Sequence, residues 1–137
     1  MPENIRLEVV TPEKNVVSED VQIVAAPGIL GEFGVLNGHT PFLTILKTGV
    51  LRYTDANGKE RFVFINGGFS EALPNKVTVL AESAERRSEI DPERAKEALK
   101  RAEERLGKDR SDEEIDFVRA RLALGRAIQR IKLYEIQ

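Results

Sequence analysis

The hydrophobic pattern of the chain changes character near Glu85. Before it, apolar residues recur in short runs that are separated by glycine and proline turns. After it, apolar residues recur at spacings of three and four among many charged side chains. Short runs between turn residues predict strands, and three-and-four spacing predicts helices. We therefore predict two structural units, residues 1–86 and residues 87–137.

The first unit reads as a series of short strands. Ile5, Leu7 and Val9 alternate with polar residues, which is typical of a half-buried strand. Asn57-Gly58 stands between two alternating runs and predicts a hairpin. The other runs with strand character are 16–17, 21–24, 33–36, 48–53, 61–65, 69–73 and 77–80. Many strands with no helix between them predict an antiparallel β-sandwich or flattened barrel.

The second unit reads as a helical hairpin. Asp91-Pro92 is a helix-start signal and Gly107 a helix end. Ser111-Asp112-Glu113-Glu114 opens a second helix with a capping-box pattern. The apolar stripe of the first helix is Ala95, Ala98, Leu99, Ala102 and Leu106. Because the connection is short, the helices should run antiparallel, and the predicted fold class is α+β: a sandwich followed by a helical hairpin.

The second helix carries two apolar stripes. One consists of Ala120, Leu124, Ala127 and Ile131, and the opposite one of Val118, Leu122 and Leu133. One stripe can pair with the first helix, which leaves the other for a second partner. Two docking choices separated by a small free-energy gap are what a conformational switch requires. The basic residues between the stripes are Arg119, Arg121, Arg126, Arg130 and Lys132, and on composition alone they form a solvated face. Gly125, in the middle of this helix, marks either a close contact or a bend.

The amino-acid composition excludes several classes of binding and catalytic site. The 137 residues have a net charge of -2, which gives no global electrostatic case for nucleic acid or an anionic membrane. With no cysteine and a single histidine, His39, the chain lacks the residues for a thiolate, a metal cluster or a catalytic triad. The glycines at 28–38 are not followed by Lys-Ser or Lys-Thr, so they indicate tight turns and not a phosphate loop. The first ten residues lack the apolar core of a signal peptide, and no apolar run is long enough to span a bilayer, so we expect a soluble, cytoplasmic chain.

One stretch resembles a known family. Residues 31–42, GEFGVLNGHTPF, follow Val9-Val10-Thr11-Pro12 and precede Asn66-Gly67-Gly68-Phe69. Together these motifs resemble the epsilon subunit of bacterial F-type ATP synthase, over essentially the whole chain. Asn37 stands where the family commonly has proline, and asparagine can also serve a turn.

The resemblance implies a non-catalytic rotor subunit. Its sandwich would bind the gamma subunit of the stalk and the c-ring, with Glu32 and His39 as contacts. Its hairpin would either fold against the sandwich or extend into the catalytic head, where it inhibits ATP hydrolysis. In the extended state, basic residues would meet an acidic surface of the catalytic beta subunits, and the candidates are Arg121, Arg126, Arg130 and Lys132. The same resemblance implies a peripheral protein on the cytoplasmic face of the bacterial inner membrane.

The resemblance also implies a regulatory ligand, ATP, and no catalytic cofactor. Residues 90–95 match the family motif Ile/Leu-Asp-x-x-Arg-Ala of members that bind ATP at the folded hairpin, which implicates Ile90, Asp91, Arg94 and Ala95. By resemblance, Arg126 and Arg130 approach the phosphates, and Glu85 lies with Asp91 near the base and ribose. Without ATP, the same Asp91 is an N-cap and Arg94 an exposed residue of the first turn.

Two other classes of function stay open on the sequence. A free-standing ATP-sensing module needs only the arginine cluster and no multisubunit machine. A small hydrolase could use paired carboxylates such as Glu113 and Asp116, but acidic residues near a helix start are expected from the helix dipole. No nucleophile, base or metal set accompanies these carboxylates, which weighs against an enzyme.

Overall fold

The computed structural model describes residues 3–107 and 114–136. It divides the chain into two compact units, residues 1–88 and 89–137. The division falls two residues after the one set by the sequence pattern, because the last strand of the first unit continues to Arg86 and a 3-10 turn, Arg87–Glu89, follows it.

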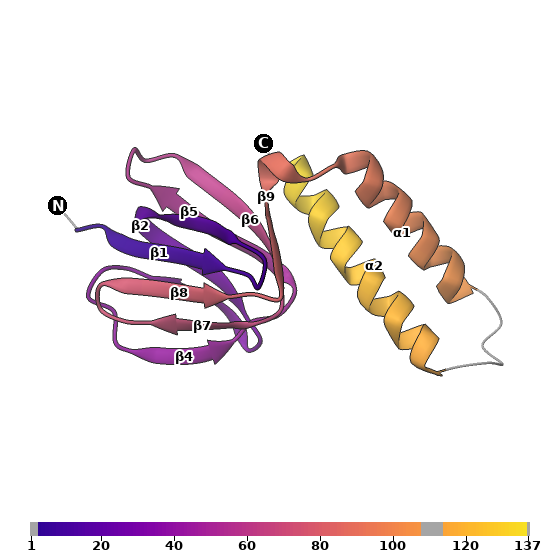
Figure 1. Cartoon of the computed structure of the whole chain (residues 1–137), viewed down its shortest axis with the longest axis horizontal. Helices are drawn as coiled ribbons and strands as arrows, with labels where there is room; N and C mark the ends of the chain where they lie inside the picture. Colours follow the sequence, from indigo (N-terminus) through magenta and orange to yellow (C-terminus); the bar gives the residue numbers. More distant parts are fainter. Residues whose placement is uncertain (1–2, 108–113, 137) are drawn as a thin grey trace. The chain divides into compact units, whose positions relative to one another are not determined.

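The first unit is an open sandwich with nine strands among the described residues (Figure 1). The strands are β1 (Ile5–Val10), β2 (Asn15–Gly28), β3 (Gly31–Val35), β4 (Phe42–Ile45), β5 (Gly49–Asp55), β6 (Glu60–Asn66), β7 (Phe69–Ala72), β8 (Lys76–Leu80) and β9 (Ser83–Arg86). Their order across the sheet is β4-β7-β8-β1-β2-β5-β6-β9, and β3 pairs with β2. The predicted α+β class with an N-terminal sandwich is confirmed.

The long strand β2 joins the two layers of the sandwich. Its first half pairs with β1, and its second half pairs with β3 and β5. The register with β5 is irregular between Val21 and Ile23, where the strand changes partners. The core lies between the layers, and Ile5, Leu7 and Val9 of β1 are fully buried as their alternation predicts.

Two features differ from the sequence prediction. β1 and β8 pair in parallel, while every other strand pair among the described residues is antiparallel. β4 and β9 were not predicted, because each is only four residues long and is held by a partner distant in sequence. The hairpin at Asn57-Gly58 does form, between β5 and β6, with φ of +85° at Gly58.

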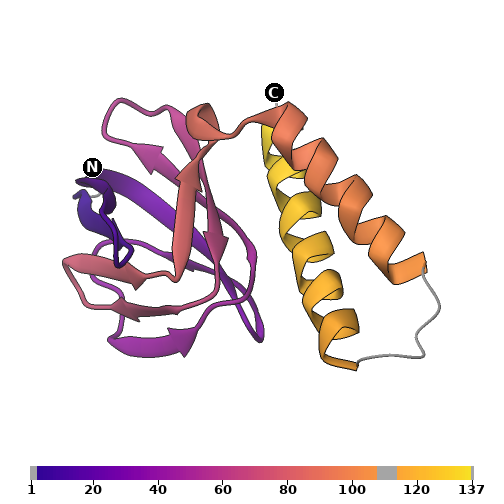
Figure 2. The same ribbon diagram turned by 45° about the vertical axis from the view of Figure 1, so that its right-hand side comes forward.

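The second unit consists of two antiparallel helices, α1 (Pro92–Gly107) and α2 (Glu114–Glu135), which lie side by side in Figures 1 and 2. The first helix begins and ends where the sequence predicts. The capping box at 111–114 lies mostly outside the described residues. No helix within residues 3–107 and 114–136 is long and apolar enough to cross a membrane.

The apolar stripes of the hairpin are partly as expected. Ala95 and Ala102 of α1 are buried, as are Ala120 and Ala127 of α2, so the two small-residue stripes allow the helices to approach closely. The opposite stripe of α2 is exposed at Val118 and Leu122 only, which are 50% and 60% exposed. Leu133 is fully buried, so the prediction that it belongs to a free stripe is wrong in this structure.

Candidate docking surface and nucleotide site

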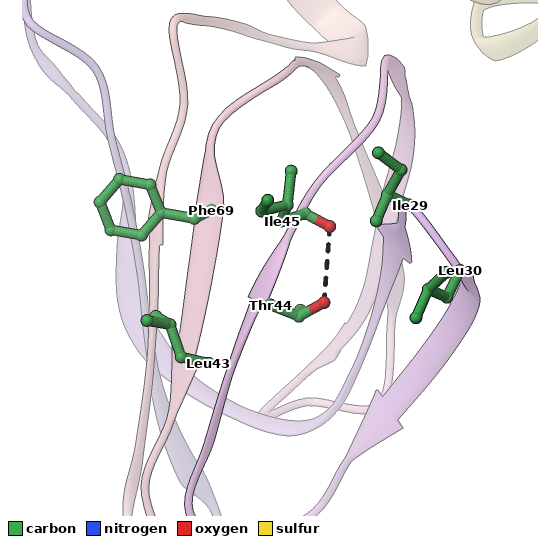
Figure 3. A pocket seen from close by; sticks show the side chains of 6 residues that line it. All are labelled: Ile29, Leu30, Leu43, Thr44, Ile45 and Phe69. Atoms are coloured by element: carbon green, nitrogen blue, oxygen red, sulfur yellow. Dashed lines mark hydrogen bonds between the residues drawn. The ribbon is translucent and has the colours of Figure 1, made fainter.

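One edge of the sandwich exposes a contiguous group of large apolar side chains. Ile29, Leu30, Leu43, Ile45 and Phe69 are between 45% and 98% exposed. With Thr44 they line a shallow hollow of about 500 Å³, which Figure 3 shows from close by. We call these five apolar side chains the apolar patch.

Backbone pairing explains why the apolar patch faces outward. The amide of Ile29 donates a hydrogen bond to the carbonyl of Ile45 at 2.9 Å, which ties the turn between β2 and β3 to strand β4. Strand β4 pairs with β7 so that Ile45 lies opposite Phe69. Because side chains alternate along a strand, Leu43 and Ile45 share the outer face of β4. Three segments distant in sequence thus contribute to one surface.

A second hollow adjoins the apolar patch. It measures about 480 Å³, and its lining includes Val10, Pro12, Leu80 and, again, Phe69. The Phe69 ring therefore stands between two apolar hollows. Its position follows from Gly68, whose φ is +107° and where a Cβ would lie 2.0 Å from the carbonyl oxygen of Leu80.

The two predicted partner contacts of the sandwich, Glu32 and His39, lie between the Ile29-Leu30 turn and strand β4 in the sequence. Glu32 follows the Ile29-Leu30 turn and is exposed, with its carboxylate in an ion pair with Arg52 of β5. His39 precedes β4 and is half-buried, and its Nδ1 lies 2.6 Å from the carbonyl oxygen of Thr40. The His39 ring also packs against Phe42, with ring centroids 5.1 Å apart.

The motif residues at the start of α1 form a helix cap. The Asp91 carboxylate accepts hydrogen bonds from the backbone amides of Glu93 and Arg94 at 3.1 and 3.2 Å. Ile90 and Ala95 are buried, while Asp91 and Arg94 are exposed. The capping geometry accounts for Asp91 without any ligand, and the exposed Arg94 guanidinium is accessible to one.

The remaining candidates for the nucleotide site lie on two elements. Arg126 and Arg130 are one helical turn apart in the C-terminal half of α2, and both are half-buried. In Figures 1 and 2 the C-terminal end of α2 lies beside the first turn of α1. Arg130 is five residues before the end of α2, and Arg126 is one turn further back, in the middle of the helix. Glu85 is half-buried on β9 of the first unit, opposite Phe64 in the register.

The four candidates for contact with a catalytic head are not equally exposed, because Arg126 and Arg130 are half-buried. Arg121 and Lys132 are both exposed, and Arg121 lies next to the exposed Leu122. For the hydrolase alternative, Glu113 and the side chain of Asp116 lie outside the described residues. Among the residues that are described, no group of three or more His, Cys, Asp or Glu side chains could hold a metal ion.

The apolar patch was missed by sequence reasoning, which assigned Phe69 to a strand and placed Ile29, Leu30, Leu43 and Ile45 in no predicted element. One signal was available. Ile29 and Leu30 are two large apolar residues in a tight turn between Gly28 and Gly31, where a solvent-exposed turn normally carries polar residues.

Comparison with known proteins identifies the family. Residues 4–87 match the family model described as the ATP synthase, Delta/Epsilon chain, beta-sandwich domain, and residues 88–135 match its long alpha-helix domain. The ATP synthase epsilon chain of Desulforapulum autotrophicum is 64% identical over 135 residues, which are 98% of each chain. The epsilon chain of Nitratidesulfovibrio vulgaris is 53% identical over 133 residues, or 97% of each chain.

Solved structures agree with the sequence relatives. A chain in the Euglena gracilis mitochondrial ATP synthase, in a structure of its OSCP, F1 and c-ring, superposes with a TM-score of 0.81 at 26% identity over 94% of this chain and 80% of that one. A chain of the Tetrahymena thermophila central stalk and c-ring, at 12% identity, shares the fold with a TM-score of 0.61. The chain therefore belongs to the ATP synthase delta/epsilon family, as an epsilon-type accessory chain and not a catalytic one.

Proposed function

We propose that this epsilon-type chain is part of the central stalk of an F-type ATP synthase, where its sandwich docks on the gamma subunit and the c-ring. In that position it couples proton-driven rotation to ATP synthesis. It is then a peripheral protein on the cytoplasmic face of the bacterial inner membrane. The related Euglena chain comes from a complex that contains F1 and the c-ring, which supports this placement.

The observation that carries the docking proposal is the apolar patch. Large apolar side chains gathered on one exposed surface are uncommon on soluble monomers and mark interaction sites. Leu30 is 98% exposed and Leu43 is 68% exposed. Such side chains contribute about 1.5–3 kcal/mol each when a partner buries them fully. Phe69, between two hollows, is in a position to interlock with side chains of that partner.

Binding to a reconstituted stalk tests the docking proposal. Leu43→Ser and Phe69→Ser should each weaken binding to an epsilon-depleted catalytic head with its gamma subunit by at least tenfold. Ile23→Ser is the matched control, because Ile23 is 39% exposed but lines neither hollow. Undiminished binding of both patch variants would exclude the patch as the docking surface.

The helical hairpin is proposed as a regulatory arm that inhibits ATP hydrolysis when it extends into the catalytic head. The support is the exposed side of α2, which combines the apolar Val118 and Leu122 with the basic Arg121 and Lys132. An apolar stripe with a basic flank suits an acidic partner surface, since the apolar side chains contribute affinity and the charges favour the correct partner.

ATP is proposed as a ligand that holds the arm in its folded state. Arg94 is in the first turn of α1, and Arg126 and Arg130 are in the C-terminal half of α2, which runs antiparallel to α1. Several guanidinium groups around a triphosphate form charge-assisted hydrogen bonds. A ligand that binds only the folded arm stabilises it by about 2.7 kcal/mol when its concentration is a hundred times Kd. Falling ATP would then release the arm and stop wasteful hydrolysis.

Isothermal titration calorimetry of the full chain with ATP tests this proposal. We expect saturable binding that Arg126→Ala weakens by tenfold or more, since a charge-assisted hydrogen bond contributes about 1.5–3 kcal/mol. Arg119→Ala, an exposed arginine on the same helix, is the control and should bind as the unaltered chain does. Absence of heat and of any saturable shift would exclude ATP as the ligand. ATP binding by a chain that forms no complex with the stalk would favour the free-standing sensor.

A further inference from the structure

Strand β9 is a short edge strand, and the connection to the helical hairpin follows it directly. It is four residues long and lies at the edge of the sheet, and among the strands of the described residues it pairs only with β6. It is also the last strand of the first unit, so the connection to the helical hairpin starts where β9 ends. Short edge strands with one neighbour open readily, which makes any further contact that fixes β9 consequential.

The side chain of Arg86, the last residue of β9, supplies such a contact. Its Nε donates a hydrogen bond to the backbone carbonyl of Val16 at 2.9 Å. Its guanidinium also reaches the Tyr53 hydroxyl, at 3.4 Å, and Glu19 Oε2, at 4.0 Å. One side chain thus joins β9 to β2 and β5, two strands that do not neighbour it in the sheet.

One of the partners of Arg86 is buried. The Arg86 side chain is 36% exposed, and Tyr53 is only 2% exposed. The planar guanidinium can donate hydrogen bonds to a carbonyl, a hydroxyl and a carboxylate at the same time, whereas the compact ammonium group of lysine cannot reach all three. Hydrogen bonds from a charged donor also contribute more to the stability of the folded state than hydrogen bonds between neutral groups.

We propose that Arg86 is the anchor of the arm: its contacts with Val16, Tyr53 and Glu19 fix the end of β9 and so determine where the connection to the hairpin begins. This rests on the proposed regulatory arm. With β9 fixed, residues 87–91 connect the sandwich to α1, and without the anchor β9 opens and the connection grows to residues 83–91. A flexible connection lengthened in this way lowers the effective concentration of the arm at its folded position about twofold.

Arg86 also acts on the ionisation of Tyr53. Burial and then the Glu19 carboxylate raise the pKa of the Tyr53 phenol above its ordinary value, while the guanidiniums of Arg86 and Arg61 lower it. Loss of Arg86 should therefore raise the pKa of Tyr53 further. Loss of an unrelated surface arginine should leave this pKa unchanged.

Hydrogen exchange in the full chain tests the anchor directly. In Arg86→Met the amides of β9 should exchange at least tenfold faster, while those of β1 and β8 keep their rates, and the tyrosinate absorbance of Tyr53 should titrate at higher pH. Arg86→Lys should restore neither the slow exchange of the β9 amides nor the pKa of Tyr53 fully to the values of the unaltered chain. The control is Arg6→Met, because the Arg6 side chain has a similar exposure of 41% and its partners, Glu8, Ser18 and Asp20, are on β1 and β2. Unchanged exchange in β9, or equally faster exchange throughout the sandwich, would overturn the proposal.

Energy transfer between the two units tests separately whether the contacts of Arg86 affect the position of the arm. The chain contains no cysteine, so Glu13→Cys with Glu103→Cys gives one pair of labels, on the sandwich and on α1, for energy transfer. Arg86→Met should raise the population with separated labels about twofold. Faster exchange in β9 without any change in energy transfer would contradict the mobile arm while leaving the contacts of Arg86 in place.

Discussion

Two glycines with positive φ illustrate how local constraints differ at the residue scale. Gly58 has φ of +85° and nothing within 4 Å of the position that a Cβ would take. Gly68 has φ of +107°, and its Cβ would meet the backbone of Leu80 and Ala81 at 2.0 and 2.8 Å. Gly58 is therefore needed only because its backbone has a positive φ. Gly68 is needed for its positive φ and also because a side chain there would overlap the backbone of β8 and the residue after it.

Alanine substitution separates these two requirements. Gly58→Ala should destabilise the sandwich by about 1 kcal/mol, the cost of a left-handed conformation for an L-residue. Gly68→Ala should cost more than about 3 kcal/mol, since backbone strain is joined by overlap with backbone atoms that have little freedom to move. Denaturant unfolding of both variants measures the difference, and equal costs would contradict the close approach at Gly68.

Asp55 stabilises the hairpin between β5 and β6 through its charged form. Its carboxylate accepts hydrogen bonds from the amides of Lys59 and Asn57 at 2.9 and 3.0 Å and from Arg61 Nε at 3.2 Å. The backbone hydrogen bond from Lys59 has the largest effect and lowers the pKa of Asp55 below its ordinary value of 3.8. Burial opposes this shift, and the contacts with Arg61 and Asn57 lower the pKa further. A lowered pKa in the folded state contributes stability above the unfolded pKa and loses it as the pH falls through the folded one.

Asp55→Asn should therefore lower the free energy of unfolding near neutral pH. The gap between the two proteins should shrink as the pH falls from about 4 to about 2, because the native carboxyl then becomes protonated. Denaturant unfolding across that range measures the gap. Asp20→Asn, at an exposed site with a single 3.5 Å contact to Arg6, is the control and should show a smaller gap near neutral pH. A gap for Asp55→Asn that stays constant with pH would contradict the role of its charge.

At the scale of elements, α2 contains a glycine for which the structure gives no packing reason. A Cβ at Gly125 would meet nothing within 4 Å, and the helix continues through it. The described residues of the helical unit therefore make no close contact at this position.

Gly125→Ala should stabilise the helical unit by about 1 kcal/mol, because alanine loses less backbone entropy on entering a helix. Ala123→Gly on the same helix should have the opposite sign. Unfolding followed by circular dichroism at the helix signal measures both. Destabilisation by Gly125→Ala would show that the glycine serves a bend or a contact with another partner.

The strands show how far local patterns determine elements. The alternation in β1 and the Asn57-Gly58 turn are local signals, and both strands of that hairpin could be predicted. β4 could not, because Phe42–Ile45 becomes a strand only through pairing with β7, some 25 residues later in the chain. Likewise β9 was read as a boundary, since its order depends on β6 and on Arg86.

At the scale of the whole molecule, the fold class and the family could be predicted, but the docking surface could not. Leu43, Ile45 and Phe69 have the hydrophobicity of core residues, and only the register between β4 and β7 places them outside. The cap at Asp91 and the arginines of α2 were predicted by residue number, and ATP binding there stays a prediction. The function of each unit depends on a partner, so no pattern within the chain alone could establish it.

ATP hydrolysis by an epsilon-depleted catalytic head with its gamma subunit tests the central claim of one docking unit and one regulatory arm. The full chain and a truncation that ends at Ser88, the last residue of the first unit, are added separately, and binding of each is verified. We predict that both bind the stalk and that only the full chain inhibits hydrolysis. Equal hydrolysis rates with both proteins bound would contradict the regulatory arm, and failure of both to bind would contradict the docking of the sandwich.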